Sequence, residues 1–159
     1  MVIHLSASHS LIERYRPRFG RPVSFSRAVG STAFRALRFA PFEPFPYAVE
    51  VGATWLAASA QRTGINAEAK LLMFGHAFET WDAARVDLRT DARNERSRHA
   101  IRAVGARFEG VLRNWQPSLV QGEEGRYRDS AMFSVTAEEW PSTAALLRRR
   151  LAQRDPSAT

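Results

Sequence analysis

The sequence lacks cysteine entirely and contains one lysine, Lys70. Without cysteine the chain has no disulfide, no thiolate metal site and no cysteine nucleophile. Its histidines are His4, His9, His76 and His99, and they show none of the paired spacing that is typical of metal sites. We therefore expect no metal, and almost all of the positive charge comes from arginine.

Long apolar runs are also missing. None approaches the roughly 18 residues that a membrane-spanning helix needs, and the N-terminus lacks the apolar core of a signal peptide. We expect a cytoplasmic protein without a membrane partner. The formal net charge is +7, but the arginines are scattered, with one run of three at 148–150. This scatter argues against nucleic-acid binding, although a basic nucleic-acid-associated domain stays an alternative.

Two glycine motifs that hold nucleotides are absent as well. The chain has neither the phosphate loop of nucleotide hydrolases nor the glycine fingerprint of dinucleotide-binding enzymes. Nucleotide hydrolysis and dinucleotide redox chemistry therefore lose support.

Apolar periodicity predicts alternating strands and helices after an ambiguous start. The predicted strands are residues 33–39, 47–56, 84–90, 108–114 and 126–136, and the predicted helices are residues 66–81, 94–104 and 141–153. A short helix at 8–15 and a strand at 22–26 are expected before them. Asn94 is a suitable N-cap, and Gly105 lies where a helix commonly ends. A strand–helix–strand–helix centre flanked by hairpins predicts an α/β (α+β) fold with a mixed sheet.

Residues 61–69, Gln-Arg-Thr-Gly-Ile-Asn-Ala-Glu-Ala, follow a predicted strand and begin a predicted helix. The first N–H groups of a helix lack intrahelical partners, and the helix dipole adds partial positive charge there. A strand, a glycine-containing turn and a helix start together are typical of a phosphate site. The alternative is an ordinary turn in which Gly64 supplies backbone freedom.

Seven segments carry a resemblance to a known family. They start at Val29 (VGSTAF), Glu50 (EVGATWL), Gln61 (QRTGINAEAKLL), Thr90 (TDARNERS), Gly105 (GARFEGVLR), Arg128 (RD) and Glu139 (EWP). In this order and spacing, residues 29–151 resemble the RimJ/RimL-type branch of the GCN5-related N-acetyltransferases (GNAT). The resemblance implies a mixed, mostly antiparallel sheet with flanking helices. It also implies an acyltransferase that moves an acetyl group from acetyl-CoA to an amine by direct attack.

The resemblance also implies a site between splayed strands. Backbone groups near the end of the strand at 47–56 would pair with pantetheine, and the following loop would hold the pyrophosphate. The implied cofactor-binding residues are Trp55, Leu56, Gln61, Arg62, Thr63, Gly64, Ile65, Asn66 and Asn94. A backbone N–H near Trp55 would stabilise the oxyanion, and Ser97 would protonate the leaving sulfur.

Glu50 is our candidate for a base that acts through water. Each assignment has a structural alternative. Asn94 can serve only as an N-cap, Ser97 as an ordinary first-turn serine and Glu50 as a structural residue. We expect the ring of Trp55 to pack in the core while its backbone serves the site.

The sequence departs from the family at its start, where the first 28 residues do not resemble the part that helps to form the acceptor pocket. We therefore divide the chain into an atypical segment at 1–28, an acetyl-CoA-binding domain at 29–153 and a disordered tail at 154–159. The expected acceptor is a protein N-terminus, an amino acid or a small amine, and the expected assembly is a monomer or a homodimer. A truncated relative that binds acetyl-CoA but transfers weakly or not at all is the alternative.

Overall fold

The computed structural model describes residues 2–4, 23–28, 31–39 and 48–153. These residues form a seven-stranded sheet with the order β1-β2-β3-β4-β5-β7-β6. Its strands are β1 (Val2–His4), β2 (Val23–Ala28), β3 (Ser31–Phe39), β4 (Ala48–Trp55), β5 (Arg85–Asp91), β6 (Arg107–Pro117) and β7 (Tyr127–Thr136). Neighbours pair antiparallel except at β1–β2 and β4–β5. The predicted mixed, mostly antiparallel sheet is therefore confirmed.

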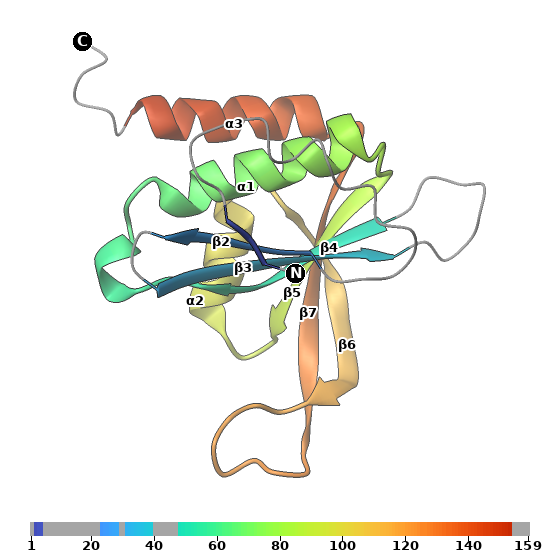
Figure 1. Cartoon of the computed structure of the whole chain (residues 1–159). Helices are drawn as coiled ribbons and strands as arrows, with labels where there is room; N and C mark the ends of the chain where they lie inside the picture. The colour runs from blue at the N-terminus through green and yellow to red at the C-terminus, as the bar shows by residue number, and fades with distance from the viewer. Residues whose placement is uncertain (1, 5–22, 29–30, 40–47, 154–159) are drawn as a thin grey trace.

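The described residues include three α-helices, which are α1 (Ile65–Gly75), α2 (Glu95–Ala103) and α3 (Trp140–Ala152). Helix α1 connects β4 to β5, α2 connects β5 to β6, and α3 follows β7. Helices α1 and α3 lie side by side across the sheet (Figure 1). The predicted helix at 66–81 differs from the structure at its end. After Gly75 the backbone widens into a π-helical turn at His76–Thr80, and the Trp81 N–H donates to the His76 carbonyl at 3.1 Å.

One apolar core lies between the helices and one face of the sheet. Alternate residues of β5 and β7 point into it, so that Val86, Leu88 and Phe133 are buried against Phe74 of α1 and Leu147 of α3. This alternation follows from strand geometry, because successive side chains point to opposite faces. The opposite face of β5 carries Arg85, Asp87, Arg89 and Asp91, and it is polar.

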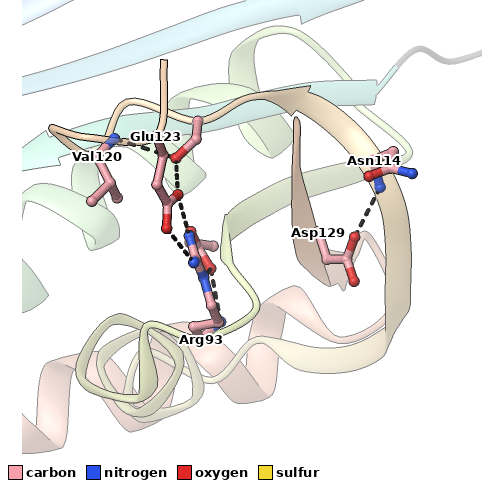
Figure 2. A network of polar contacts seen from close by, with 7 residues as sticks. Arg93, Asn114, Val120, Glu123 and Asp129 are labelled. Atoms are coloured by element: carbon pink, nitrogen blue, oxygen red, sulfur yellow. Dashed lines mark hydrogen bonds and ion pairs between the residues drawn. The ribbon is translucent and has the colours of Figure 1, made fainter. Parts of the chain in front are cut away.

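The hairpin of β6 and β7 is irregular and is held by polar contacts (Figure 2). Asn114 has a positive φ of 50° in a bulge of β6, and its N–H donates to Asp129 Oδ1 at 2.9 Å. Arg93, just before α2, binds both Asp91 and Glu123, with its Nη1 2.7 Å from Glu123 Oε1. Arg93 therefore ties the hairpin loop to the end of β5.

The predicted elements from residue 31 onward all have counterparts in the structure. The strand expected at 22–26 overlaps β2 from Val23, and residue 22 lies outside the described residues. The helix expected at 8–15 and the tail at 154–159 lie outside the described residues. The domain boundary at residue 28 stays a prediction. Residues on both sides of it belong to the same sheet, because β2 pairs with β3.

Candidate functional site

β4 and β5 pair over only a short length and then separate. Parallel pairing runs from Ala48 with Arg85 to Glu50 with Asp87, while β4 continues to Trp55 and β5 to Asp91. We call residues 51–55 and 88–91 the splayed strand ends. Because none of the described strands pairs with β4 on this side beyond Glu50, its backbone groups there are available to a ligand that extends the sheet.

A bulge interrupts β4 within this unpaired part. The pairing with β3 passes from Arg35 with Gly52 to Ala33 with Trp55, so β4 contains one more residue than β3 over this interval. A bulge bends a strand and redirects the following backbone groups. The sequence did not indicate this bulge.

The loop from β4 to α1 begins with a short 3₁₀ helix, Ala58–Ala60. The residue that needs unusual backbone freedom is Arg62, with a φ of 61°, whereas Gly64 has an ordinary φ of −67°. A Cβ at Gly64 would lie 3.1 Å from Leu151 Cδ2. Gly64 therefore allows a close approach of the Leu151 side chain of α3, and the interpretation that it supplies backbone freedom is wrong.

The start of α1 presents unpaired backbone donors. The Thr63 hydroxyl donates to the Ala60 carbonyl at 2.7 Å and lies 3.4 Å from the N–H of Ile65. Regular helical bonding starts when the Glu68 N–H donates to the Gly64 carbonyl at 3.0 Å. Among the described residues, no hydrogen-bond acceptor faces the N–H groups of Asn66 and Ala67. These donors and the helix dipole suit an anion.

Asn66 contributes a further open polar atom. Its Oδ1 is buried and has no hydrogen-bond partner within the described part of the chain. A buried acceptor without a partner costs free energy unless a ligand or water satisfies it. The beginning of α1 thus offers backbone N–H donors, which suit phosphate oxygens, and a side-chain acceptor, which suits an amide N–H. A ligand that contains both phosphate and amide groups would satisfy both.

The Gln61 side chain links three parts of the site. Its Nε2 donates to the Leu56 carbonyl at 3.0 Å, and its Oε1 accepts from the guanidinium of Arg96 on α2. Gln61 therefore holds the loop in place through its side chain. The Leu56 carbonyl, which we expected to serve pantetheine, already accepts this bond.

The beginning of α2 lies at the same edge of the sheet as this loop, because parallel strands end at the same edge and α2 follows β5. Asn94 is the N-cap, and its Oδ1 accepts from the Ser97 N–H at 2.9 Å. The capping role of Asn94 is confirmed. Ser97 is half-buried in the first turn. Contacts of Asn94 and Ser97 with a cofactor stay predictions.

Glu50 lies at the last paired position before the strands separate. It is 8% exposed, and its Oε1 is 2.9 Å from Nε of Arg89 on β5. Burial raises the pKa of the Glu50 carboxyl, the nearby Arg89 lowers it, and Asp87 raises it, with a net upward shift. A raised pKa gives a carboxylate that takes up protons more readily than an ordinary glutamate.

The expectation for the Trp55 ring is wrong. We expected the ring to pack in the core, but Trp55 is 55% exposed. The reason is its place beyond the last β4–β5 pair and beyond the bulge. The core beneath β4 is formed by Val49 and Val51 instead.

Lys70 is a residue of this region that the sequence reasoning missed. It is 3% exposed, and its Nζ donates to Thr54 Oγ1 of β4 at 2.9 Å. Burial lowers the pKa of Lys70 to about 7. Lys70 lies four residues after Asn66 and four residues before Phe74, so that all three share one face of α1. Because Phe74 belongs to the apolar side of this helix, the spacing could have indicated that Lys70 is buried.

Among the described residues, no group of three or more His, Asp or Glu side chains could hold a metal ion. A helix with the length and apolar character of a membrane span is absent from the same part of the chain.

The site can now be compared with known proteins. A family model described as an acetyltransferase (GNAT) domain matches residues 12–107, which is more than half of the chain. The chain belongs to the GNAT acetyltransferase family. Acetyl transfer is the general activity of this family, and the match includes β4, the loop, α1, β5 and α2. It also begins inside the segment that we separated at residue 28.

Solved structures agree with this assignment. One crystal structure, assigned as an acetyltransferase, has 35% identity and a TM-score of 0.63, with 78% of this chain and 69% of that chain covered. A GCN5-related N-acetyltransferase from Brucella melitensis has 26% identity and a TM-score of 0.64, with coverage of 79% and 55%. Mycobacterium smegmatis RimJ in complex with CoA-disulfide has 25% identity and a TM-score of 0.59, with coverage of 76% and 55%.

The chain thus spans little more than half the length of the last two GNAT relatives. A search of curated proteins finds no match. The overall similarity shows that this chain shares the GNAT fold with the structures above. In this chain the fold is a mixed sheet covered by helices, and the sheet opens between β4 and β5.

Proposed function

We propose that this GNAT protein is a RimJ/RimL-type N-acetyltransferase that uses acetyl-CoA. The observation that carries the proposal is the separation of β4 and β5 next to a helix start with unpaired N–H groups. Acetyl-CoA supplies an acetyl group activated as a thioester. The two parts of the site match the amide-containing arm and the phosphates of such a molecule.

The residues of the chain would divide the binding between them. Backbone amides of Arg62, Thr63, Gly64, Ile65 and Asn66 would hold the pyrophosphate at the start of α1. Backbone groups of the splayed strand ends, including Trp55, and of the adjoining Leu56 would pair with the pantetheine amides as an added strand. The Leu56 carbonyl would then share its lone pairs between pantetheine and Gln61. Asn94 and the buried Oδ1 of Asn66 would add side-chain contacts.

Catalysis would rest mainly on holding the amine and the thioester together, which can lower the barrier by several kcal/mol. Glu50 would remove the amine proton through a water molecule, and the upward shift of its pKa, caused mainly by burial, makes it a stronger base than an ordinary glutamate. Ser97 would pass a proton to the departing sulfur. A free α-amine has a pKa of roughly 7.7–8.0, so a weak base is sufficient.

The acceptor in this proposal is an amine of a protein N-terminus, an amino acid or a small molecule. The solved RimJ structure supports the branch, although its title names only the bound CoA-disulfide. We propose a cytoplasmic monomer or homodimer, without nucleic acid or membrane as partner.

The decisive binding experiment compares Gly64→Asp with Gly64→Asn. Both side chains meet Leu151 in the same way, but only aspartate places a negative charge beside the expected phosphates. Gly64→Asp should bind coenzyme A at least tenfold more weakly than Gly64→Asn in isothermal titration calorimetry. Equal affinities would contradict the phosphate site at the start of α1.

A second measurement separates transfer from binding. The wild-type chain should release free thiol from acetyl-CoA when a panel of α-amines is added. If it binds coenzyme A but releases no thiol with any amine, the transferase proposal fails and the alternative of a binding protein without transfer stands.

A further inference from the structure

Lys70 occupies an unusual place for a charged side chain. It lies on the inward side of α1 with 3% of its surface exposed, although every other basic residue of the chain is an arginine. Removing an ammonium group from water costs several kcal/mol even after the surroundings relax. Two explanations are possible for a buried lysine of this kind. Either its hydrogen bond supports another part of the fold, or its long side chain only fills space in the core.

A hydrogen bond connects Lys70 to the splayed strand ends. Its Nζ donates to Thr54 Oγ1 at 2.9 Å, across a sequence separation of 16 residues. Thr54 lies in the extra-residue interval of β4 and immediately precedes Trp55. Thr54 is itself exposed, so the hydrogen bond joins a buried donor on α1 to the open end of β4.

This part of β4 needs additional support. Beyond Glu50 it has no pairing with β5, and on the β3 side the bulge interrupts the ladder. A strand end with an incomplete ladder moves among several backbone conformations unless side chains hold it. The Lys70–Thr54 bond holds it from the helix side.

We propose that Lys70 is a positioning residue for acetyl transfer, because its bond to Thr54 fixes the bulged end of β4, whose backbone would face the acetyl group of a bound acetyl-CoA. This inference rests on the proposed function and names a residue that acts through Thr54 and touches neither substrate. The site must hold reacting groups within a fraction of an ångström, so loss of this support should slow the reaction more than it weakens binding.

The opposing interpretation is that Lys70 only fills space beneath β4. Lys70→Met keeps a long unbranched side chain and removes the donor, and Thr54→Val keeps the shape of threonine and removes the acceptor. Under the space-filling interpretation neither substitution changes turnover. Under the positioning interpretation both do, and the double variant is no worse than the more affected single variant, because both remove the same bond.

Two readouts test the proposal. The first is amide hydrogen exchange of residues 53–55 in the protein without ligand, which should be at least tenfold faster in Lys70→Met and in Thr54→Val. The second is acetyl transfer, where kcat should fall about tenfold while the affinity for coenzyme A stays within twofold. Leu72→Met, on the exposed side of the same helix, is the matched control and should change neither.

Unchanged amide exchange at residues 53–55 overturns the proposal, and so does an unchanged kcat. It is also overturned if the fold-losses of kcat in the two single variants multiply in the double variant. If Lys70→Met does not fold, Thr54→Val at its exposed position decides alone. Failure of the wild-type chain to transfer acetyl groups contradicts the proposed function, while the exchange measurement still decides whether Lys70 fixes this strand end.

Discussion

Lys70 couples the stability of the fold to pH. Burial lowers its pKa in the folded state from 10.5 to about 7. Between these two values the unfolded chain binds a proton at this side chain that the folded chain has released. Rising pH between these two values therefore favours the folded state. Below pH 7 the Lys70 amine becomes protonated while it is buried, or the chain unfolds so that the charge reaches water.

We expect the free energy of unfolding of the wild-type chain to rise relative to that of Lys70→Met between pH 7 and pH 10. The increase is at most about 1.4 kcal/mol per pH unit, the value for one proton. Urea denaturation of both proteins at each pH measures it, and the comparison cancels the titration of all other groups. Parallel stability profiles would show that the Lys70 pKa is not lowered.

Among the elements, α3 depends on one aromatic side chain at its first turn. Trp140 stacks on Phe78 with ring centroids 5.4 Å apart and meets the edge of Phe74. Its Nε1 donates to Glu79 Oε1 at 2.8 Å, within the π-helical turn. Stacked aromatic pairs and a satisfied indole N–H both add to the apolar burial. Trp140 thus anchors α3 to the end of α1.

Trp140→Ala should lower the free energy of unfolding by about 3–5 kcal/mol, as is usual when a large buried aromatic side chain is removed. Trp140→Phe should cost less, because it loses the bond to Glu79 but keeps a ring against Phe78. Urea denaturation gives both values. Trp115→Ala is the control, since Trp115 is 49% exposed, and it should change stability by at most about 0.5 kcal/mol. Similar losses at positions 140 and 115 would contradict this role.

The whole sheet consists of two parts that meet at a short seam. Strands β1 to β4 form one part and β5, β7 and β6 the other, and the seam is the pairing of residues 48–50 with residues 85–87. The Glu50–Arg89 ion pair lies beside the seam, and α1 connects its two strands in the sequence. A ligand bound at the splayed strand ends would lengthen the seam.

Coenzyme A should therefore slow amide hydrogen exchange in residues 51–55 and at the beginning of α1. The hairpin of β6 and β7 should be unaffected, because it lies on the far side of β5 from β4 and its loop is already held by Arg93 and Glu123. Hydrogen-exchange mass spectrometry with and without coenzyme A measures both regions. Protection confined to the hairpin would contradict this location of the ligand.

Local patterns predicted much of this fold. Asn94 and Gly105 marked the ends of α2, because a helix start needs a side-chain acceptor and its end tolerates a positive φ, here 94° at Gly105. The order of strands and helices from residue 31 followed from periodicity in the same way. The pattern of strand, glycine-containing turn and helix start located the loop at Gln61, and the family resemblance then assigned it to the pyrophosphate of acetyl-CoA as an expectation.

Contacts between distant segments were not predictable. The exposure of Trp55 depends on where β4 and β5 stop pairing, and the bond from Lys70 to Thr54 depends on the packing of a helix on a strand. The side chain of Gln61 meets Arg96 across 35 residues, so no local pattern reveals that it is occupied. Whether Glu50 and Ser97 act in catalysis stays a prediction.

The burial of Lys70 has a practical consequence for chemical work with this protein. An amine with a pKa near 7 would react readily with acyl donors and amine-selective reagents if it were accessible. It is the one lysine of the chain, and the fold covers it. Acetylation of the protein's own lysine should therefore add no background to activity measurements. The rate at which an amine-selective reagent labels Lys70 would measure how often α1 separates from β4.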